Sequence, residues 1–180
     1  MKGNTAFTIT AAIAATLAAE AACILVFVFS GVYDTASTLP HNALTHWLLQ
    51  TTLKNSLRHR AAEVEVPPLA TPRLLNIGFT HYDEMCVSCH GAPGIKPSEI
   101  GKRLYPGPPD LKKQAPKLSE REVYYVVAYG IKMTGMPAFA PTHTKEEVWG
   151  IATFVKELPR MSAPEYRRLK KLKPEGHHHD

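Results

Sequence analysis

The longest uninterrupted apolar stretch of the chain lies at its N-terminus. Between Thr5 and Tyr33 the sequence reads TAFTITAAIAATLAAEAACILVFVFSGVY, in which Glu20 is the single charged residue. About 20 apolar residues are enough for a helix to cross the hydrocarbon core of a bilayer, so residues 1–33 are predicted to form a membrane anchor. A cleaved signal peptide is the alternative, because Ala19-Glu20-Ala21 resembles a small-residue cleavage site. The most apolar part, residues 24–29, follows that site, which favours an uncleaved, single-pass anchor.

The anchor also carries a pattern that favours a protein partner inside the membrane. Small residues allow close helix packing, and here they are Ala11, Ala15, Ala18, Ala19 and Ala22. Glu20 is costly against lipid and invites a polar partner. We therefore expect the anchor to pack against another membrane subunit. An alanine-rich spacer helix with a snorkelling Glu20 is the alternative.

Residues 34–70 are predicted to hold a second helix followed by a stiff linker. The helix comes after Leu39-Pro40-His41-Asn42 and reads ALTHWLLQTTLKNSLRHRAA. One of its faces carries Leu44, Trp47, Leu48 and Thr51. Trp47 would suit the headgroup layer of a membrane, whereas a plain connecting helix explains the same pattern, and both interpretations remain open. Val66-Pro67-Pro68-Leu69 ends the region as an extended linker.

Residues 71–160 show the start and stop signals of a compact all-α domain. Thr71-Pro72 gives a cap with proline at the first helical position, and this helix is expected to run to His90. Capping boxes at residues 119–122 and 144–147 precede the apolar segments VYYVVAYGI and VWGIATFVKEL. The ends of these two helices are marked by Gly130 and Pro159.

A long Pro/Gly-rich loop, GAPGIKPSEIGKRLYPGPPDLKKQAPK, separates the first two helices of this domain. Loops of this length without regular structure are usually functional or are organised around something. A domain of roughly ninety residues with three main helices has little apolar core of its own. A large apolar cofactor would supply the missing interior.

Composition narrows the classes of function. The chain has 180 residues, of which 44% are hydrophobic and 21% charged, and a formal net charge of +5. This mild basicity suits an acidic partner or an anionic membrane surface, but aromatic and basic residues do not interleave, so no nucleic-acid binding is expected. Three cysteines are too few for a secreted disulfide scaffold. Residues 161–180 are expected to be a solvated basic tail that ends in histidines at 177–179.

The segment MCVSCHG places two thiols and an imidazole within five residues. A structural zinc site would need four ligands, usually from two such pairs, and a redox dithiol would follow a strand in a βαβ setting. A disulfide between Cys86 and Cys89 would leave His90 unexplained. Covalent haem attachment uses all three residues. Two cysteines one helical turn apart reach the two vinyl groups on one porphyrin edge, and His90 then projects under the ring towards the iron.

An electron-transfer haem also takes a second axial ligand, often a methionine from a distant loop. After the second helix of the domain comes GIKMTGMPAF, in which Met136 lies between a glycine and a proline. A tight turn there can present a side chain to the ring, so Met136 is predicted to be that ligand. Met133 is the rival.

Region 71–160, about half of the chain, resembles the class I monohaem c-type cytochromes. The resemblance rests on CVSCH, on GMPAF and on the order of the helices. It implies one covalently bound haem c, with thioether bonds to Cys86 and Cys89 and with His90 and Met136 on the iron. It also implies that the Pro109 carbonyl accepts a hydrogen bond from His90 Nδ1. A further implication is close packing of Gly78 and Tyr82 against Phe154.

Ligation by His90 and Met136 would leave the iron no open position, so we expect one-electron transfer without substrate chemistry. The expected partners are redox proteins, a donor and an acceptor of a respiratory or dehydrogenase chain. Basic residues between 96 and 117 could steer an acidic one, and a merely solvated loop surface is the alternative interpretation. Family membership would place the haem domain on the periplasmic side of the inner membrane. The alternative function is a haem-based sensor or peroxidase with an open distal position.

Overall fold

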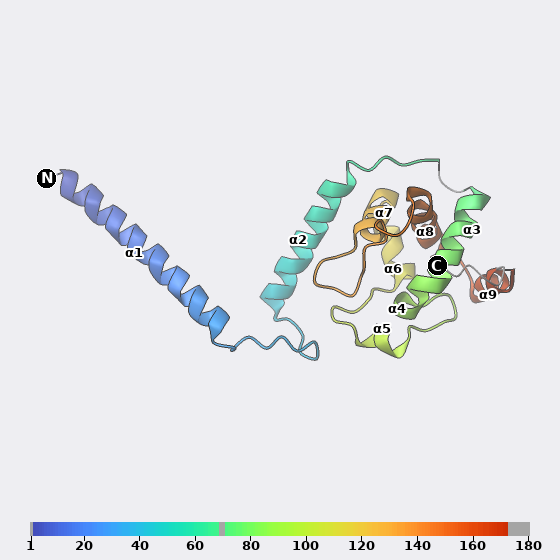
Figure 1. The fold of residues 1–180 in the computed structure, drawn as a ribbon, viewed down its shortest axis with the longest axis horizontal. Coiled ribbons are helices and arrows are strands. Elements are labelled where there is room, and N and C mark those ends of the chain that lie inside the picture. Colours follow the sequence, from blue (N-terminus) through green and yellow to red (C-terminus); the bar gives the residue numbers. More distant parts are fainter. Residues whose placement is uncertain (1, 69–70, 173–180) are drawn as a thin grey trace. The chain divides into compact units, whose positions relative to one another are not determined.

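The computed structural model describes residues 2–68 and 71–172, without the side chains of residues 2–4. Within the described residues, regular structure consists of helices and one isolated bridge between Ala92 and Ile95, so the predicted all-α class is confirmed (Figure 1). The chain divides into two compact units, Met1–Pro40 and His41–Asp180. The histidines at 177–179 and Leu69 of the predicted linker lie outside the described residues.

The first unit contains the long helix α1 (Lys2–Phe29). All of its described side chains are exposed. Over Thr5–Phe29, α1 is long and apolar enough to cross a membrane, and no other helix in the described part of the chain is. A signal sequence passes the same test of length and composition. The helix is therefore a membrane anchor or a signal sequence.

The second unit begins with α2 (Ala43–Ala61), which starts where the sequence predicted. The Asn42 side chain caps it by accepting a hydrogen bond from the Thr45 amide. Its second half packs on α7 (Glu120–Tyr129) and buries Leu57 and Ala61. The large apolar residues of its first half are exposed: Leu44, Trp47, Leu48 and Leu49.

The core of the second unit forms where α3 (Pro72–His81) packs against α8 (Lys145–Glu157). A Cβ atom built on Gly78 would collide with the carbonyl oxygen of Gly150, so the two backbones are in contact. The rings of Phe79 and Tyr82 pack on Phe154, with centroids 5.6 and 5.3 Å apart. The predicted packing of Gly78 and Tyr82 against Phe154 is therefore confirmed.

Both predicted capping boxes are present and set the N-termini of α7 and α8. Ser119 and Thr144 each accept a hydrogen bond from the amide three residues on, and the glutamates at those positions accept from the cap amides. Gly130 ends α7 with a φ of 65°, a conformation that favours glycine.

The long loop contains more regular structure than the sequence predicted. It forms the short helices α5 (Glu99–Arg103) and α6 (Leu111–Gln114) and a 3₁₀ turn, η2 (Ala115–Lys117). Ser98 and Asp110 cap the two helices through their side chains. Lys156 of α8 donates to the carbonyl oxygens of Ala115 and Leu118, at 3.0 and 2.6 Å. Side-chain caps and this lysine hold the loop in place. Hydrophobic periodicity did not reveal its short helices, because polar contacts stabilise them.

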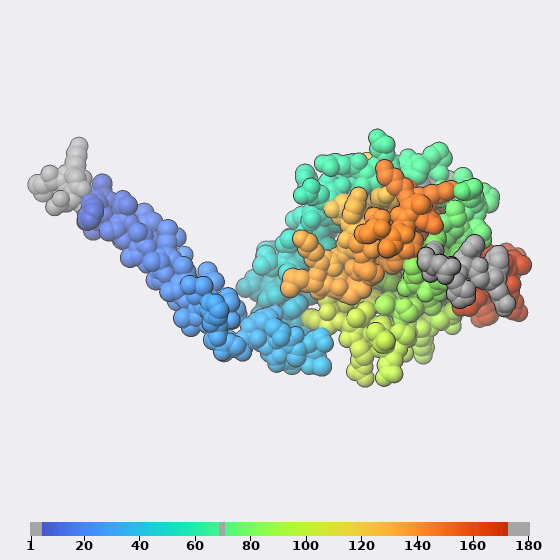
Figure 2. Space-filling view, viewed as in Figure 1, coloured from blue at the N-terminus to red at the C-terminus, as the bar shows by residue number. Residues whose placement is uncertain are grey.

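The region that we expected to be a solvated tail is helical in its described part, up to Leu172. Residues Ala163–Leu172 form a further helix, α9, on the surface beside the segment that begins with α3 (Figure 2). Tyr166 is fully buried, although Arg167, Arg168 and Lys171 are exposed. Because basic residues dominate this segment, the sequence pattern did not reveal a helix that buries one face.

The contact between α3 and α8 leads to a prediction about Gly78. Replacing Gly78 with alanine should lower the free energy of unfolding by about 3 kcal/mol, because the added methyl group would press on the backbone of α8. Chemical denaturation of the purified protein measures this loss. Gly107→Ala is the control, since the nearest atom to its new methyl group is 3.8 Å away. Equal stabilities of the two variants would contradict the close contact.

Candidate functional site

The predicted cluster lies on a continuous helical segment that changes its winding just before Cys86. Between α3 and α4 (Val87–His90) lies one π turn, η1 (Tyr82–Cys86), in which the Val87 amide donates to the Tyr82 carbonyl five residues earlier. Turns of this kind occur frequently at functional sites. The sequence predicted the helix from Pro72 to His90 but not this widened turn.

The two cysteines of the cluster are free thiols one helical turn apart. Cys86 is buried, and burial, followed by the nearby Cys89, raises its pKa to about 12. Cys89 is partly exposed at the surface of α4. Among the described residues, no group of three or more His, Cys, Asp and Glu side chains could hold a metal ion. The zinc alternative therefore finds no further ligands in this part of the chain.

His90 is the last residue of α4, and its imidazole is held from one side. Its Nδ1 atom lies 3.0 Å from the carbonyl oxygen of Pro109. A carbonyl oxygen only accepts, so Nδ1 carries the proton and Nε2 keeps its lone pair. Burial lowers the pKa of His90, while the hydrogen bond to Pro109 acts in the opposite direction. The arrangement leaves Nε2 available as a metal ligand.

The backbone around His90 is fixed by contacts on both sides. The Tyr82 hydroxyl donates to the Gly91 carbonyl oxygen at 2.7 Å inside the protein. The Ser98 amide donates to the Ser88 carbonyl oxygen at 2.8 Å. Gly101 of α5 packs so closely that a Cβ atom would lie 2.8 Å from Cys89 Cα. Sequence reasoning assigned Tyr82 to packing and missed its hydrogen bond, because a hydroxyl leaves no mark on hydrophobic periodicity.

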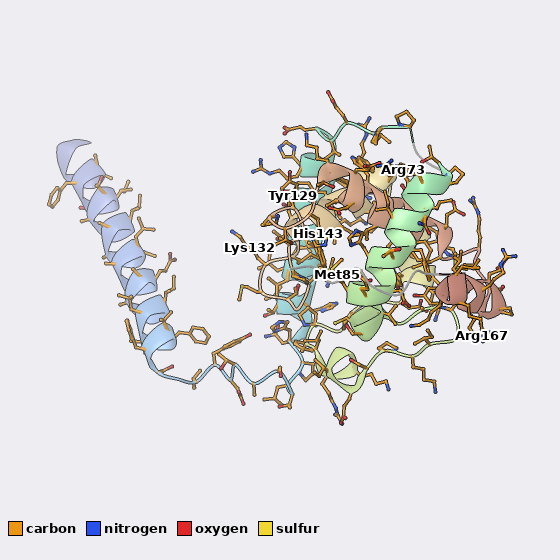
Figure 3. The ribbon with its side chains drawn as sticks, turned by 45° about the vertical axis from the view of Figure 1, so that its right-hand side comes forward. Arg73, Met85, Tyr129, Lys132, His143 and Arg167 are labelled. Atoms are coloured by element: carbon orange, nitrogen blue, oxygen red, sulfur yellow. The ribbon has the colours of Figure 1, made fainter. Side chains whose placement is uncertain are left out.

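Met136 lies in a tight turn after α7. Its carbonyl oxygen accepts from the Ile131 amide at 3.2 Å, and its amide donates to the Thr134 hydroxyl at 3.1 Å. Its side chain is partly buried against the core cluster, whereas that of Met133 is 97% exposed. Lys132, in the same turn, also lies at the surface (Figure 3). Of the two candidate methionines, Met136 is the one directed towards the protein.

The turn that holds Met136 meets the loop that holds Pro109. Leu104, just after α5, packs on Gly135, where a Cβ atom would lie 2.8 Å from Leu104 Cδ1. The Phe139 amide donates to Val127 of α7 at 3.1 Å and ties the far end of the turn. Cys86, Cys89 and His90 thus share one short segment with Pro109 against His90, and Met136 lies on a separate turn that meets the same loop through Leu104 and Gly135. Leu104 was not recognised from the sequence, because it is one leucine in a loop.

Loss of the Tyr82 hydroxyl should lower the stability of the folded protein. Tyr82→Phe removes the donor to a buried carbonyl oxygen and should lower the free energy of unfolding by about 1–3 kcal/mol. Burial also raises the pKa of Tyr82, so the hydroxyl remains a donor at all ordinary pH values. Urea denaturation measures the difference. Tyr129→Phe, at a side chain that is 56% exposed, is the control, and an equally small effect in both variants would contradict the role of this hydrogen bond.

Comparison with known proteins agrees with the site. Residues 74–155 match the family described as cytochrome C oxidase, cbb3-type, subunit III. No curated protein is similar enough to the chain to be compared with it. Cytochrome c domains carry covalently bound haem c and transfer electrons. The match runs from the first turn of α3 to near the end of α8 and includes CVSCH and Met136. Residues 74–155 of this chain are therefore a cytochrome c domain of the cbb3 oxidase subunit III type.

Proposed function

We propose that the chain is a membrane-anchored one-electron carrier in which Cys86 and Cys89 bind haem c and His90 and Met136 ligate its iron. The observation that carries this proposal is the orientation of His90. Its Nδ1 atom is engaged by Pro109, so Nε2 is the nitrogen left for the iron. Two free thiols on the preceding turn supply the thioether bonds.

The chain's own residues fit a haem bound in this way. The thiols of Cys86 and Cys89 lie on one side of a helical turn that ends at His90. A partly buried Met136, on a separate turn, would supply a thioether sulfur as the second ligand. Apolar side chains from several elements lie partly buried around the core, among them Leu111, Leu118 and Val87.

When bound, haem c supplies one electron at a time through its iron. The protein's contribution is to fix the positions of the two proposed ligands, His90 and Met136. The Pro109 carbonyl fixes the ring of His90 and makes Nε2 more basic. Two hydrogen bonds, to Ile131 and to Thr134, fix the backbone of Met136. With His90 and Met136 both bound to it, the iron would offer no site to oxygen or peroxide.

The partners that we propose are redox proteins, a donor and an acceptor, of which one docks on the loop between α4 and α7. Six basic residues there are exposed: Lys96, Lys102, Arg103, Lys112, Lys113 and Lys117. Lys113 is shared with Asp110, 3.7 Å away, so the surface is not uniformly positive. Exposed charges of this kind accelerate the docking of an acidic protein, and this electrostatic attraction weakens as the salt concentration rises. The family description suggests that the chain works as a subunit of a membrane complex.

We further propose that α1 stays attached and anchors the carrier, with the haem domain on the periplasmic side of the inner membrane. Its length and composition support an anchor. Its alanines and Glu20 favour a partner helix in the membrane over a lone span in lipid. In this arrangement the anchor keeps the carrier close to its partners.

Substitution of the two methionines tests the iron ligand. Met136→Ala should abolish the long-wavelength absorption that sulfur ligation gives to ferric haem, lower the potential and allow rapid binding of carbon monoxide. Met133→Ala should leave the spectrum unchanged, because that side chain points into solvent. In the wild type, the pigment should also stay with the protein in acidified acetone. Rapid carbon monoxide binding by the wild type would instead favour the sensor or peroxidase.

The fate of α1 tests the anchor. The full chain, expressed in a bacterium that matures cytochromes c, should remain in membranes washed with alkaline carbonate. Intact-mass measurement should show residues up to Ala21 still present. A chain that begins after Ala21 and is released into the soluble fraction would identify a signal peptide. The spectrum of the haem domain would be the same in either case.

A further inference from the structure

A carboxylate is enclosed by the protein three residues before Cys86. The Tyr166 hydroxyl donates to Asp83 Oδ1 at 3.0 Å, and Lys170 Nζ lies 3.0 Å from the same oxygen. The side chain of Asp83 is 8% exposed, whereas that of Lys170 is 53% exposed. Both donors belong to α9, and Asp83 belongs to the π turn. Helix α9 is thus hydrogen-bonded to the π turn η1, which contains Cys86.

α9 is held in this position by contacts of its own. The Tyr166 ring packs on those of Phe79 and Phe154, with centroids 5.4 and 6.4 Å away. At its start, Ala163 lies against Gly94, where a Cβ atom would come within 2.8 Å of the alanine methyl group. Arg167, labelled in Figure 3, lies on the exposed side of the helix. α9 therefore touches the cluster segment both before Cys86 and after His90.

The Tyr166 hydroxyl is buried where it contacts the carboxylate of Asp83. Burial, and after it the charge and hydrogen bond of Asp83, raises the pKa of Tyr166, with smaller contributions from Tyr82 and Cys86. The tyrosine thus remains a neutral donor. Of these two α9 side chains, Tyr166 is neutral and Lys170 brings a full charge.

This network lies partly outside the region that matches the family. The match ends at residue 155, and α9 begins at Ala163. Asp83 lies inside the matched region, but both of its α9 donors lie beyond it. The contact therefore joins the matched cytochrome c domain to a helix that lies beyond the match.

We propose that Asp83, held by Tyr166 and Lys170, is a residue that sets the charge beside the haem and thereby the midpoint potential. The inference rests on the proposed attachment of haem to Cys86 and Cys89. A negative charge near the iron favours the ferric state, and its effect is stronger where water is excluded. Lys170 is half exposed and better screened than Asp83. The carboxylate therefore outweighs its partner, and α9 controls by how much.

Two substitutions should move the potential in opposite directions. Asp83→Asn removes the negative charge and should raise the midpoint potential, because the positive charge of Lys170 is then left. Lys170→Met removes the partner charge and should lower the potential. Redox titration of the full holoprotein in detergent, followed by absorption, measures both shifts. A network that only stabilises the fold would not give shifts of opposite sign.

Lys171→Met is the matched control, since it removes the same charge from the next residue of α9 and should give a smaller shift than Lys170→Met. Shifts of the same sign, or no shift beyond that control, would overturn the proposal. If Asp83→Asn gives no holoprotein, Lys170→Met decides: a lower potential than the control supports the proposal, and an equal or higher one overturns it. The spectrum of the wild type distinguishes failure of this inference from failure of the proposed function. If the wild-type spectrum shows no sulfur ligation, the proposed function itself is refuted.

Discussion

The backbone contact between Gly78 and Gly150 is the constraint on which the second unit depends. Without side chains at this point, α3 and α8 approach closely enough for Phe79, Tyr82 and Phe154 to interlock. This packing fixes the direction in which α3 continues. The continuation carries Cys86, Cys89 and His90, so the glycine contact positions a cluster that begins eight residues later. A local packing rule thereby sets the place of the chemistry.

The π turn then adapts this rigid start to the needs of the cluster. One additional residue in the turn shifts every later side chain by about 100° around the helix axis relative to a regular α-helix. Tyr82 faces the core and reaches the Gly91 carbonyl oxygen, while Asp83 faces α9. His90, at the end of α4, faces Pro109. Three neighbouring structures are thus bound by one short segment.

Sequence signals with a local physical cause predicted their elements well. The capping boxes at Ser119 and Thr144 and the glycine stop at Gly130 appear as expected, because each depends on hydrogen bonds within a few residues. The contact of Gly78 with the last main helix came from the family resemblance. α9 was missed because Tyr166 is its one fully buried residue among many charges. Its apolar contacts come from residues that are far away in the sequence.

The site residues divide in the same way into those set by neighbours in the sequence and those set by residues far away in it. CVSCH is a local motif and could be read directly, whereas the different burial of Met136 and Met133 depends on how the turn folds. A Thr134 hydroxyl and the Ile131 amide orient that turn so that Met133 points outward. The carboxylate of Asp83 is a still more distant case, since both of its α9 donors follow more than eighty residues later. Sequence therefore predicts which groups hold a haem, but the group that we propose tunes it is held by tertiary contacts. In an electron carrier such tuning groups matter as much as the ligands, because the potential decides which partner gives and which receives.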